Sequence, residues 1–223
     1  MRISLVRHGQ SESNIGIHDH SAAGDHKVCL TATGMTQARG AGFLLQEELQ
    51  AAEEGRTLIY CSPYQRTRQT LEQMLLGGEV SRLPRVFEDT RLREIERGYG
   101  NSEEQQTLRP IHGYFYYRYA GGESPADCSD RISNYLESMM RQVARKKPDN
   151  VVIVTHGLAI RCFVMRFLHL TVEQFESLDN PDNCDIITID LKENILEPVF
   201  TSGRWAVEGI KLRKQTVTEE VQC

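Results

Sequence analysis

Short apolar runs that end in polar turns recur along this chain, and they constrain its fold more than any other sequence feature. Residues 2–6, 57–61 and 151–154 are apolar runs of strand length, and 84–88 is a weaker one. Stretches with helical spacing of apolar residues follow them, the longest from about Pro125 to Lys146. This alternation predicts an α/β fold, a single three-layer α/β/α domain with a mostly parallel central sheet.

Local signals place two further helices. Thr31 or Thr33 is a candidate N-cap for a helix that runs to about Ala52. Ser62 and Pro63 predict the N-cap and first position of another helix, because proline is favoured at the first helical position. The apolar positions of the first of these helices include Met35, Ala38, Phe43, Leu44 and Leu45.

Length and spacing also set the expected domain limits. Residues 184–190 alternate between apolar and polar types, and a second candidate strand lies near 205–212. The 223 residues contain no internal repeat or low-complexity spacer. We therefore expect one domain over residues 1–212, followed by a frayed C-terminal tail over 213–223.

Composition and charge exclude several classes of partner. The formal net charge of -5 gives no support to a polyanion-binding surface, so no nucleic-acid partner is expected. No apolar run approaches the roughly 20 residues of a membrane span, and the N-terminus lacks the apolar stretch of a signal peptide. Six scattered cysteines form no Cys-x-x-Cys pair, which predicts reduced thiols. We expect a cytoplasmic protein without membrane partners.

Three of the apolar runs give way directly to segments with basic side chains. Arg7 and His8 follow the first run, residues 62–66 follow the second and end in Arg66, and His156 follows 151–154. Parallel strands present their carboxyl ends at one edge of the sheet, where α/β folds bind ligands. The sequence therefore predicts two histidines and two arginines around one pocket.

These residue types are suited to phosphoryl transfer. Guanidinium groups match phosphate oxygens and keep their charge, and they would disfavour protonation of His8, which leaves its lone pair free for nucleophilic attack. The second histidine, His156, can stabilise developing charge by hydrogen bonding. A carboxylic acid must protonate the leaving group, and Glu94 is the first candidate, with Glu88 and Glu96 as competitors.

Six segments in a fixed order resemble the histidine phosphatase superfamily, also called the phosphoglycerate mutase-like family. They span residues 7–157, and no diagnostic match lies beyond about residue 190. A lone Arg-His-Gly motif would be weak evidence for the resemblance, but six segments in the family's order are strong evidence. The segments are RHGQSESN at 7–14, LTATGMTQA at 30–38, SPYQRTRQT at 62–70, LREIERGYG at 92–100, GGES at 121–124 and VTHG at 154–157.

The resemblance implies roles for the residues of the predicted pocket. His8 matches the phosphohistidine nucleophile, and Arg7 matches its neighbouring phosphate ligand. Arg66 and His156 match the other members of the phosphate pocket. Asn14 matches a polar residue that reaches the phosphoryl oxygens. The family chemistry requires neither a metal nor a cofactor.

The resemblance also bears on the acid and on substrate binding. Glu94 matches the proton donor of the branch in which the acid follows the third strand. The other branch has an aspartate directly after the second histidine, where this chain has Gly157. Ser11, Gly157 and Arg93 join Asn14 as expected substrate-binding residues. Arg93 and its neighbour Arg97 are read equally well as surface charges or as ligands of a substrate phosphate.

One polar loop offers a competing metal site. His18, Asp19, His20 and His26 carry ligand-type side chains, but their spacing is not that of a tetrahedral site. We interpret the segment as a polar lid over the pocket.

The stretch 114–132 narrows the expected function. It resembles phosphoglycerate mutase-like proteins of plants and fungi, and true cofactor-dependent mutases carry a longer insertion before the Gly-Glu-Ser segment. We therefore expect a phosphatase for phosphate monoesters, with a phosphoglycerate mutase (an isomerase) or a catalytically silent phospho-ligand binding scaffold as alternatives. The expected partner is a small phosphorylated substrate or a phosphoprotein, and the chain is expected to be a monomer or a dimer.

Overall fold

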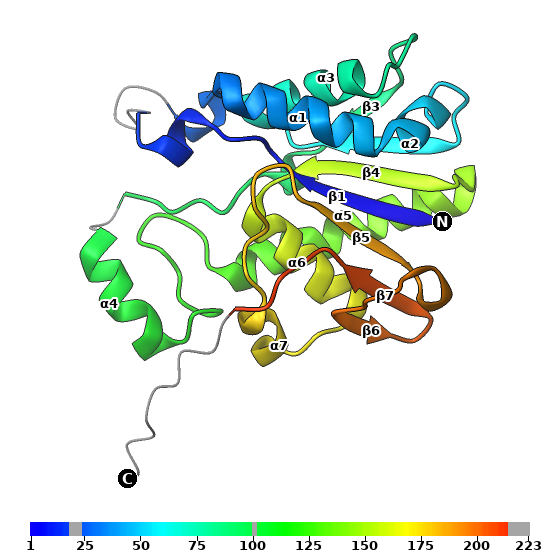
Figure 1. The fold of residues 1–223 in the computed structure, drawn as a ribbon. Coiled ribbons are helices and arrows are strands. Elements are labelled where there is room, and N and C mark those ends of the chain that lie inside the picture. Colours follow the sequence, from blue (N-terminus) through cyan, green and yellow to red (C-terminus); the bar gives the residue numbers. More distant parts are fainter. Residues whose placement is uncertain (18–23, 100–101, 214–223) are drawn as a thin grey trace.

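A seven-stranded sheet runs through the middle of the molecule, with helices against both of its faces (Figure 1). This computed structural model describes residues 1–17, 24–99 and 102–213. The strand order is β3-β2-β4-β1-β5-β7-β6. The strands are β1 Arg2–Arg7, β2 Thr57–Cys61, β3 Val86–Glu88, β4 Asn150–Thr155, β5 Ile186–Leu191, β6 Phe200–Ser202 and β7 Trp205–Glu208.

The four strands that carry the predicted motifs form the parallel half of the sheet. β3, β2, β4 and β1 run parallel, whereas β5, β7 and β6 add an antiparallel edge. Strands β1 and β4 are central and buried on both faces, which explains their near-continuous apolar runs. The predicted fold class, with a mostly parallel core, is confirmed.

Two groups of helices form the outer layers. Helices α1 and α3 lie against one face with the short α2, and α5 and α6 lie against the other (Figure 1). Each group closes a separate apolar cluster over the sheet. The helices are α1 Ala32–Leu44, α2 Gln46–Ala51, α3 Gln65–Gly77, α4 Ser102–His112, α5 Pro125–Lys146, α6 Gly157–Leu168 and α7 Val172–Ser177.

Two local expectations about helix ends are corrected. Thr31 does cap α1, accepting from Gly34 N–H at 3.0 Å, but the helix ends at Leu44 and α2 begins anew at Gln46. Ser62 and Pro63 do not begin α3, which starts at Gln65 after Tyr64. The Ser62 hydroxyl contacts a histidine of the pocket instead of capping the helix.

The buried face of α1 also differs from the expected apolar stripe. Phe43 and Leu44 are 69% and 71% exposed, because α1 meets α3 through small residues. A Cβ atom on Gly42 would lie 2.1 Å from the Met74 carbonyl oxygen of α3. The two backbones therefore approach more closely than large side chains allow. The buried residues of α1 are Gly34, Ala38, Ala41 and Gly42.

No helix in the described part of the chain combines the length and apolar character needed to cross a membrane.

We predict opposite effects of one methyl group at two glycines of α1. Gly42→Ala should destabilise the fold by about 1–3 kcal/mol, because the backbone of Met74 must shift to admit it. Gly40→Ala should be stabilising by up to about 1 kcal/mol, since nothing lies within 4 Å and alanine favours the helix. Urea unfolding of both variants tests this. Equal effects at the two positions would contradict the close packing of α1 on α3.

Candidate active site

The ends of two neighbouring parallel strands bring the two predicted histidines together. His8 follows β1 and His156 follows β4, and the last residues of these strands, Arg7 and Thr155, are register partners. The two imidazole centroids are 5.2 Å apart, with the ring planes at 63°. His8 is 4% exposed and His156 is fully buried. The predicted convergence at one sheet edge is present.

His8 is held neutral with one ring nitrogen free. Its Nδ1 lies 2.8 Å from the Gly9 carbonyl oxygen, which only accepts, so Nδ1 carries the proton and Nε2 keeps a lone pair. Burial lowers the pKa of His8 to about 3, and the charges of Arg66 and Arg7 act in the same direction. The sequence pointed to the arginines alone, whereas burial is the larger cause.

The segment after His8 packs closely against α1 and α3. Gly9 N–H donates to Thr70 Oγ1 of α3 at 3.0 Å. A Cβ on Gly9 would lie 2.5 Å from the Gly34 carbonyl oxygen of α1, so only glycine fits here without a backbone shift. The glycine of the Arg-His-Gly motif thus fixes the exit of the chain from the site.

A serine hydroxyl contacts one ring nitrogen of His156. Ser62 Oγ lies 2.8 Å from His156 Nε2, and the same oxygen accepts from Tyr64 N–H at 3.5 Å. A hydroxyl oxygen can accept a second hydrogen bond as well as donate one, so this contact is compatible with either tautomer of His156. The buried Nδ1 of the ring has no partner among the described residues. Burial first, then the charge of Arg66, holds the pKa of His156 well below its usual range.

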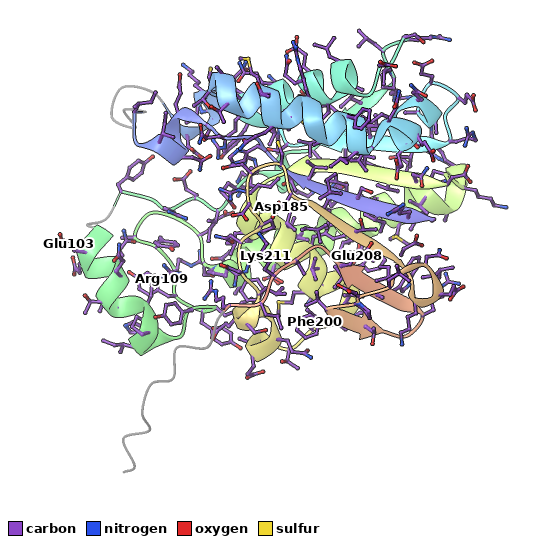
Figure 2. All side chains as sticks on the ribbon, viewed as in Figure 1. Glu103, Arg109, Asp185, Phe200, Glu208 and Lys211 are labelled. Atoms are coloured by element: carbon purple, nitrogen blue, oxygen red, sulfur yellow. The ribbon has the colours of Figure 1, made fainter. Side chains whose placement is uncertain are left out.

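Arg7 reaches across the site toward the loop before β5. Its Nη1 donates to the Pro181 carbonyl oxygen at 2.6 Å, and its buried Nε has no partner among the described residues. Asp185 follows in the same loop; its carbonyl oxygen accepts from Arg7 N–H at 3.3 Å, and Figure 2 shows the residue beside the end of β1. Burial lowers the pKa of Arg7, and the Glu94 carboxylate is the largest charge opposing that change.

Arg66 enters the site from the first turn of α3. It is buried, and among charged groups it lowers the pKa of both histidines most. Its guanidinium carbon lies 4.9 Å from the centroid of the Tyr64 ring, which in turn packs edge-on to His156 at 5.1 Å. The terminal nitrogens of Arg66 bind the carboxylate of Asp25.

The carboxylate of Glu94 lies at the start of α6, close to His156. Oε1 accepts from Ile95 N–H at 2.9 Å, and Oε2 accepts from Leu158 N–H at 3.4 Å. The N-terminus of a helix favours a carboxylate there. Thr155 Oγ1 also ties this loop to β4 by donating to the Leu92 carbonyl oxygen at 2.6 Å.

The two competing carboxylates have other surroundings. Both oxygens of Glu88 accept from Arg68, at 2.7 and 2.6 Å, on the exposed side of α3. Glu96 is exposed and accepts from Gly98 N–H at 3.2 Å. Of the three candidates, Glu94 accepts a hydrogen bond from the first turn of the helix that follows His156, which favours it as the acid.

The Glu94 loop is clamped from α5. Arg131 donates to the carbonyl oxygens of Arg91 and Arg93 at 2.6 and 2.9 Å, on either side of the loop segment that leads to Glu94. Glu123 pairs with Arg131 and also with the side chain of Arg93. The expected substrate ligand Arg93 therefore has a carboxylate partner within the protein, and its contact with substrate stays a prediction.

Asn14 and Ser11 are joined on the other side of His8. Asn14 Oδ1 accepts from both the N–H and the hydroxyl of Ser11 at 3.0 Å. Asn183 Nδ2 reaches the same oxygen at 3.2 Å and donates to the His8 carbonyl oxygen at 3.0 Å. This leaves the Asn14 amide nitrogen as its outward donor. Gly157 begins α6, and a Cβ there would meet Asn180 only at ordinary contact distance.

Several residues of the site were not predicted as such. Ser62 and Thr155 lie inside the quoted motifs, so their positions beside the strand ends were the available signal. Tyr64 also lies inside a quoted motif, at 62–70. Asp25 and Asn183 gave no comparable signal, because their roles depend on which loops meet across the pocket.

The expected metal alternative falls largely outside the described residues. His18, Asp19 and His20 belong to the 18–23 segment, so the choice between lid and metal site stays a prediction. Among the residues that the structure does describe, no group of three potential ligands gathers to hold a metal ion.

Two paired histidines, the buried Arg66 and the half-buried Arg7 lie together at the carboxyl edge of the parallel strands. The model of the histidine phosphatase superfamily (branch 1) matches residues 3–200, and the chain belongs to this family.

Named relatives include both phosphatases and mutase-like proteins. Phosphoglycerate mutase-like protein AT74 of Arabidopsis thaliana is 38% identical over 206 residues, or 85% of this chain; the match spans 65% of AT74, less than two thirds of its length. The broad-range acid phosphatase DET1 of Saccharomyces cerevisiae is 26% identical, with 86% of each chain covered. A mycobacterial glucosyl-3-phosphoglycerate phosphatase in complex with VO3 shares the fold, with a TM-score of 0.70, 24% identity and coverage of 93% and 97%.

We predict that His8 makes stability depend on pH. In the folded protein the pKa of His8 is about 3, whereas an unfolded histidine titrates near 6.5. The unfolded state therefore binds more protons as pH falls below about 6.5, and stability is lost with falling pH. Between about pH 7.5 and pH 5.5, His8→Asn should lose about 1 kcal/mol less unfolding free energy than the wild type.

Urea unfolding at the two pH values measures the difference. His169→Asn is the matched control, because it removes an exposed histidine at a left-handed position that asparagine tolerates. An unchanged pH dependence in His8→Asn would show that this imidazole is not held neutral by the fold.

Proposed function

We propose that this protein is a phosphatase that hydrolyses phosphate monoesters through a phosphohistidine on His8, with Glu94 as proton donor. The observation that carries the proposal is the state of His8, which is neutral, protonated on Nδ1 and under the charges of Arg7 and Arg66, with no partner for Nε2 among the described residues. A neutral imidazole is a competent nucleophile toward phosphorus, and flanking guanidinium groups attract the dianion it must attack.

In the first half-reaction, His8 Nε2 attacks phosphorus and the bond from phosphorus to the ester oxygen breaks. The electron pair stays on the departing oxygen, which takes the proton of a protonated Glu94. The Glu94 carboxylate contacts the first turn of α6, and His156 is the N-cap residue of that helix. In the second half-reaction the Glu94 carboxylate takes a proton from water, whose oxygen attacks phosphorus. The phosphorus–nitrogen bond breaks, and neutral His8, acidic Glu94 and inorganic phosphate result.

The surrounding donors stabilise the phosphoryl oxygens during both steps. Arg7 offers a buried Nε–H without a partner among the described residues, and His156 offers Nδ1–H when the Ser62 hydroxyl donates to its Nε2. Asn14 adds its amide nitrogen. Such donors are fixed before reaction begins, which is the main source of electrostatic stabilisation in phosphoryl transfer. The proposed steps use side chains and water, without a metal ion or cofactor.

The substrate is proposed to be a small phosphorylated molecule. The name of DET1 supports phosphatase activity. A mutase remains the second candidate, because probable phosphoglycerate mutase GpmB of Shigella dysenteriae is 30% identical over 93% of this chain and 91% of its own. The short segment between the Glu94 loop and Gly121 favours hydrolysis over transfer back to a bound sugar acid.

With 3-phosphoglycerate as substrate, the enzyme should release inorganic phosphate faster than it forms 2-phosphoglycerate. We expect inorganic phosphate to be the dominant product, because a phosphatase passes the phosphoryl group of His8 to water. Phosphate release and 2-phosphoglycerate formation are measured in parallel on the same enzyme sample. Isomerisation faster than hydrolysis would replace the proposal with the mutase.

His8→Ala should abolish turnover and leave the fold intact. The wild type, quenched rapidly during turnover of a labelled ester, should carry an acid-labile phosphoryl label that His8→Ala lacks. Arg68→Ala, which removes a side chain on the exposed part of α3, is the control and should retain label and turnover. A wild type with neither label nor turnover across a broad phosphoester panel would favour the scaffold.

Glu94→Gln should slow esters with poor leaving groups most. Nitrophenolate departs without protonation, whereas an alkoxide requires a proton. We expect kcat for an alkyl phosphate to fall at least about 100-fold, within the usual range for loss of a general acid, and kcat for nitrophenyl phosphate to fall much less. Glu88→Gln, which removes the carboxylate paired with Arg68, should spare both substrates. Equal losses in Glu94→Gln would exclude Glu94 as the acid.

A further inference from the structure

The terminal nitrogens of Arg66 are held by one carboxylate. Arg66 Nη1 donates to Asp25 Oδ1 at 3.0 Å and Nη2 donates to Asp25 Oδ2 at 3.0 Å. Nη1 also donates to the backbone carbonyl oxygen of Asp25 at 2.7 Å. The Arg66 side chain is 5% exposed, whereas that of Asp25 is 32% exposed. This pair therefore joins the buried arginine of the site to a residue at its rim.

The Asp25 contacts leave one edge of the guanidinium free. Arginine has five N–H groups, and these contacts use three of them. The two that remain are Nε–H and the second hydrogen of Nη2. These two N–H bonds lie in the guanidinium plane and point in parallel from one edge of it. This is the geometry that binds two oxygens of one phosphoryl group. No described residue accepts a hydrogen bond from this edge.

The guanidinium is already beside the reacting histidine while Asp25 holds it. Its charge is the largest charge contribution to the lowered pKa of both His8 and His156. The Tyr64 ring lies against its face, 4.9 Å from the guanidinium carbon. Asp25 therefore holds one edge of the guanidinium and the Tyr64 ring contacts it, while the Nε–Nη2 edge has no hydrogen-bond partner among the described residues.

We propose that Asp25 is a positioning residue of the phosphoryl site, which orients Arg66 so that its Nε–Nη2 edge binds the transferring group. The inference rests on the proposed function and adds to it the residue that aligns one phosphate ligand. Asp25 acts through Arg66 and does not touch the substrate.

Two effects of the Asp25 carboxylate oppose each other. Its negative charge reduces the positive potential felt by a phosphate, whereas its two hydrogen bonds remove the rotamer freedom of a long side chain. The charge is one-third exposed and lies beyond the guanidinium, so solvent screens it. The orientation of a bidentate fork depends directly on the pair. Orientation therefore dominates, and loss of Asp25 weakens phosphate binding.

The test compares Asp25→Asn with the wild type in phosphate affinity and in turnover. Calorimetric titration with inorganic phosphate measures affinity, and we expect the dissociation constant to rise by about 10- to 100-fold. Because Arg66 contacts the group common to all esters, kcat/KM should fall by the same factor for nitrophenyl and alkyl phosphates. This leaving-group independence separates Asp25 from the proton donor Glu94. Asp25→Glu should recover part of the loss.

A double-mutant cycle tests whether Asp25 works through Arg66. In an Arg66→Met background, Asp25→Asn should cause no further loss of phosphate affinity. An additive loss would assign Asp25 another role and overturn the inference. Glu88→Gln is the matched control, because it removes a bidentate carboxylate from Arg68 on the same helix but outside the site. It should leave phosphate affinity unchanged.

The possible outcomes separate the inference from its premise. Tighter phosphate binding by Asp25→Asn would make the carboxylate a competitor of the phosphoryl group, and unchanged binding would make it irrelevant; both overturn the inference. Urea unfolding confirms that each variant is folded. If the wild type binds phosphate but turns over no ester, the proposed phosphatase fails, while the effect of Asp25 on phosphate affinity is still decided by the titration.

Discussion

Burial of two imidazoles at adjacent strand ends is the constraint on which the site depends. The parallel register of β1 and β4 sets His8 and His156 5.2 Å apart, under two helical layers that exclude water. A buried charge is costly, so both rings stay neutral, and nearby arginines add to that preference. The arginines in turn keep their charge and leave donors unpaired. The proposed nucleophile and the proposed anion ligands thus follow from one pattern of desolvation.

Much of this arrangement was readable from the sequence, because the chemistry sits where strands end. Apolar runs located β1, β2 and β4, and the residues directly after them were His8, the segment leading to Arg66, and His156. Parallel strands then required these residues to meet. The six ordered motifs agreed with that geometry, and the family assignment confirms the resemblance.

The parts that could not be predicted depend on contacts between distant loops or on the absence of side chains. Asp25 and Arg66 are 41 residues apart in the sequence, and Asn183 and His8 are 175 residues apart. No periodic pattern in the sequence predicts either contact. The burial of α1 was misjudged because its inner face is made of glycine and alanine, which carry little apolar weight. Ser62 was interpreted as a helix cap, although its hydroxyl contacts His156.

The central place of β1 affects the order in which a newly made chain becomes active. His8 directly follows β1, and in the described part of the chain β1 pairs with β4 and β5, which are synthesised more than 140 residues later. The hydrogen bond from Arg7 to the Pro181 carbonyl oxygen also forms only after residue 181 has been synthesised. A nascent chain therefore keeps His8 and His156 apart through most of translation, and long-range closure of the sheet is the step that assembles the proposed site.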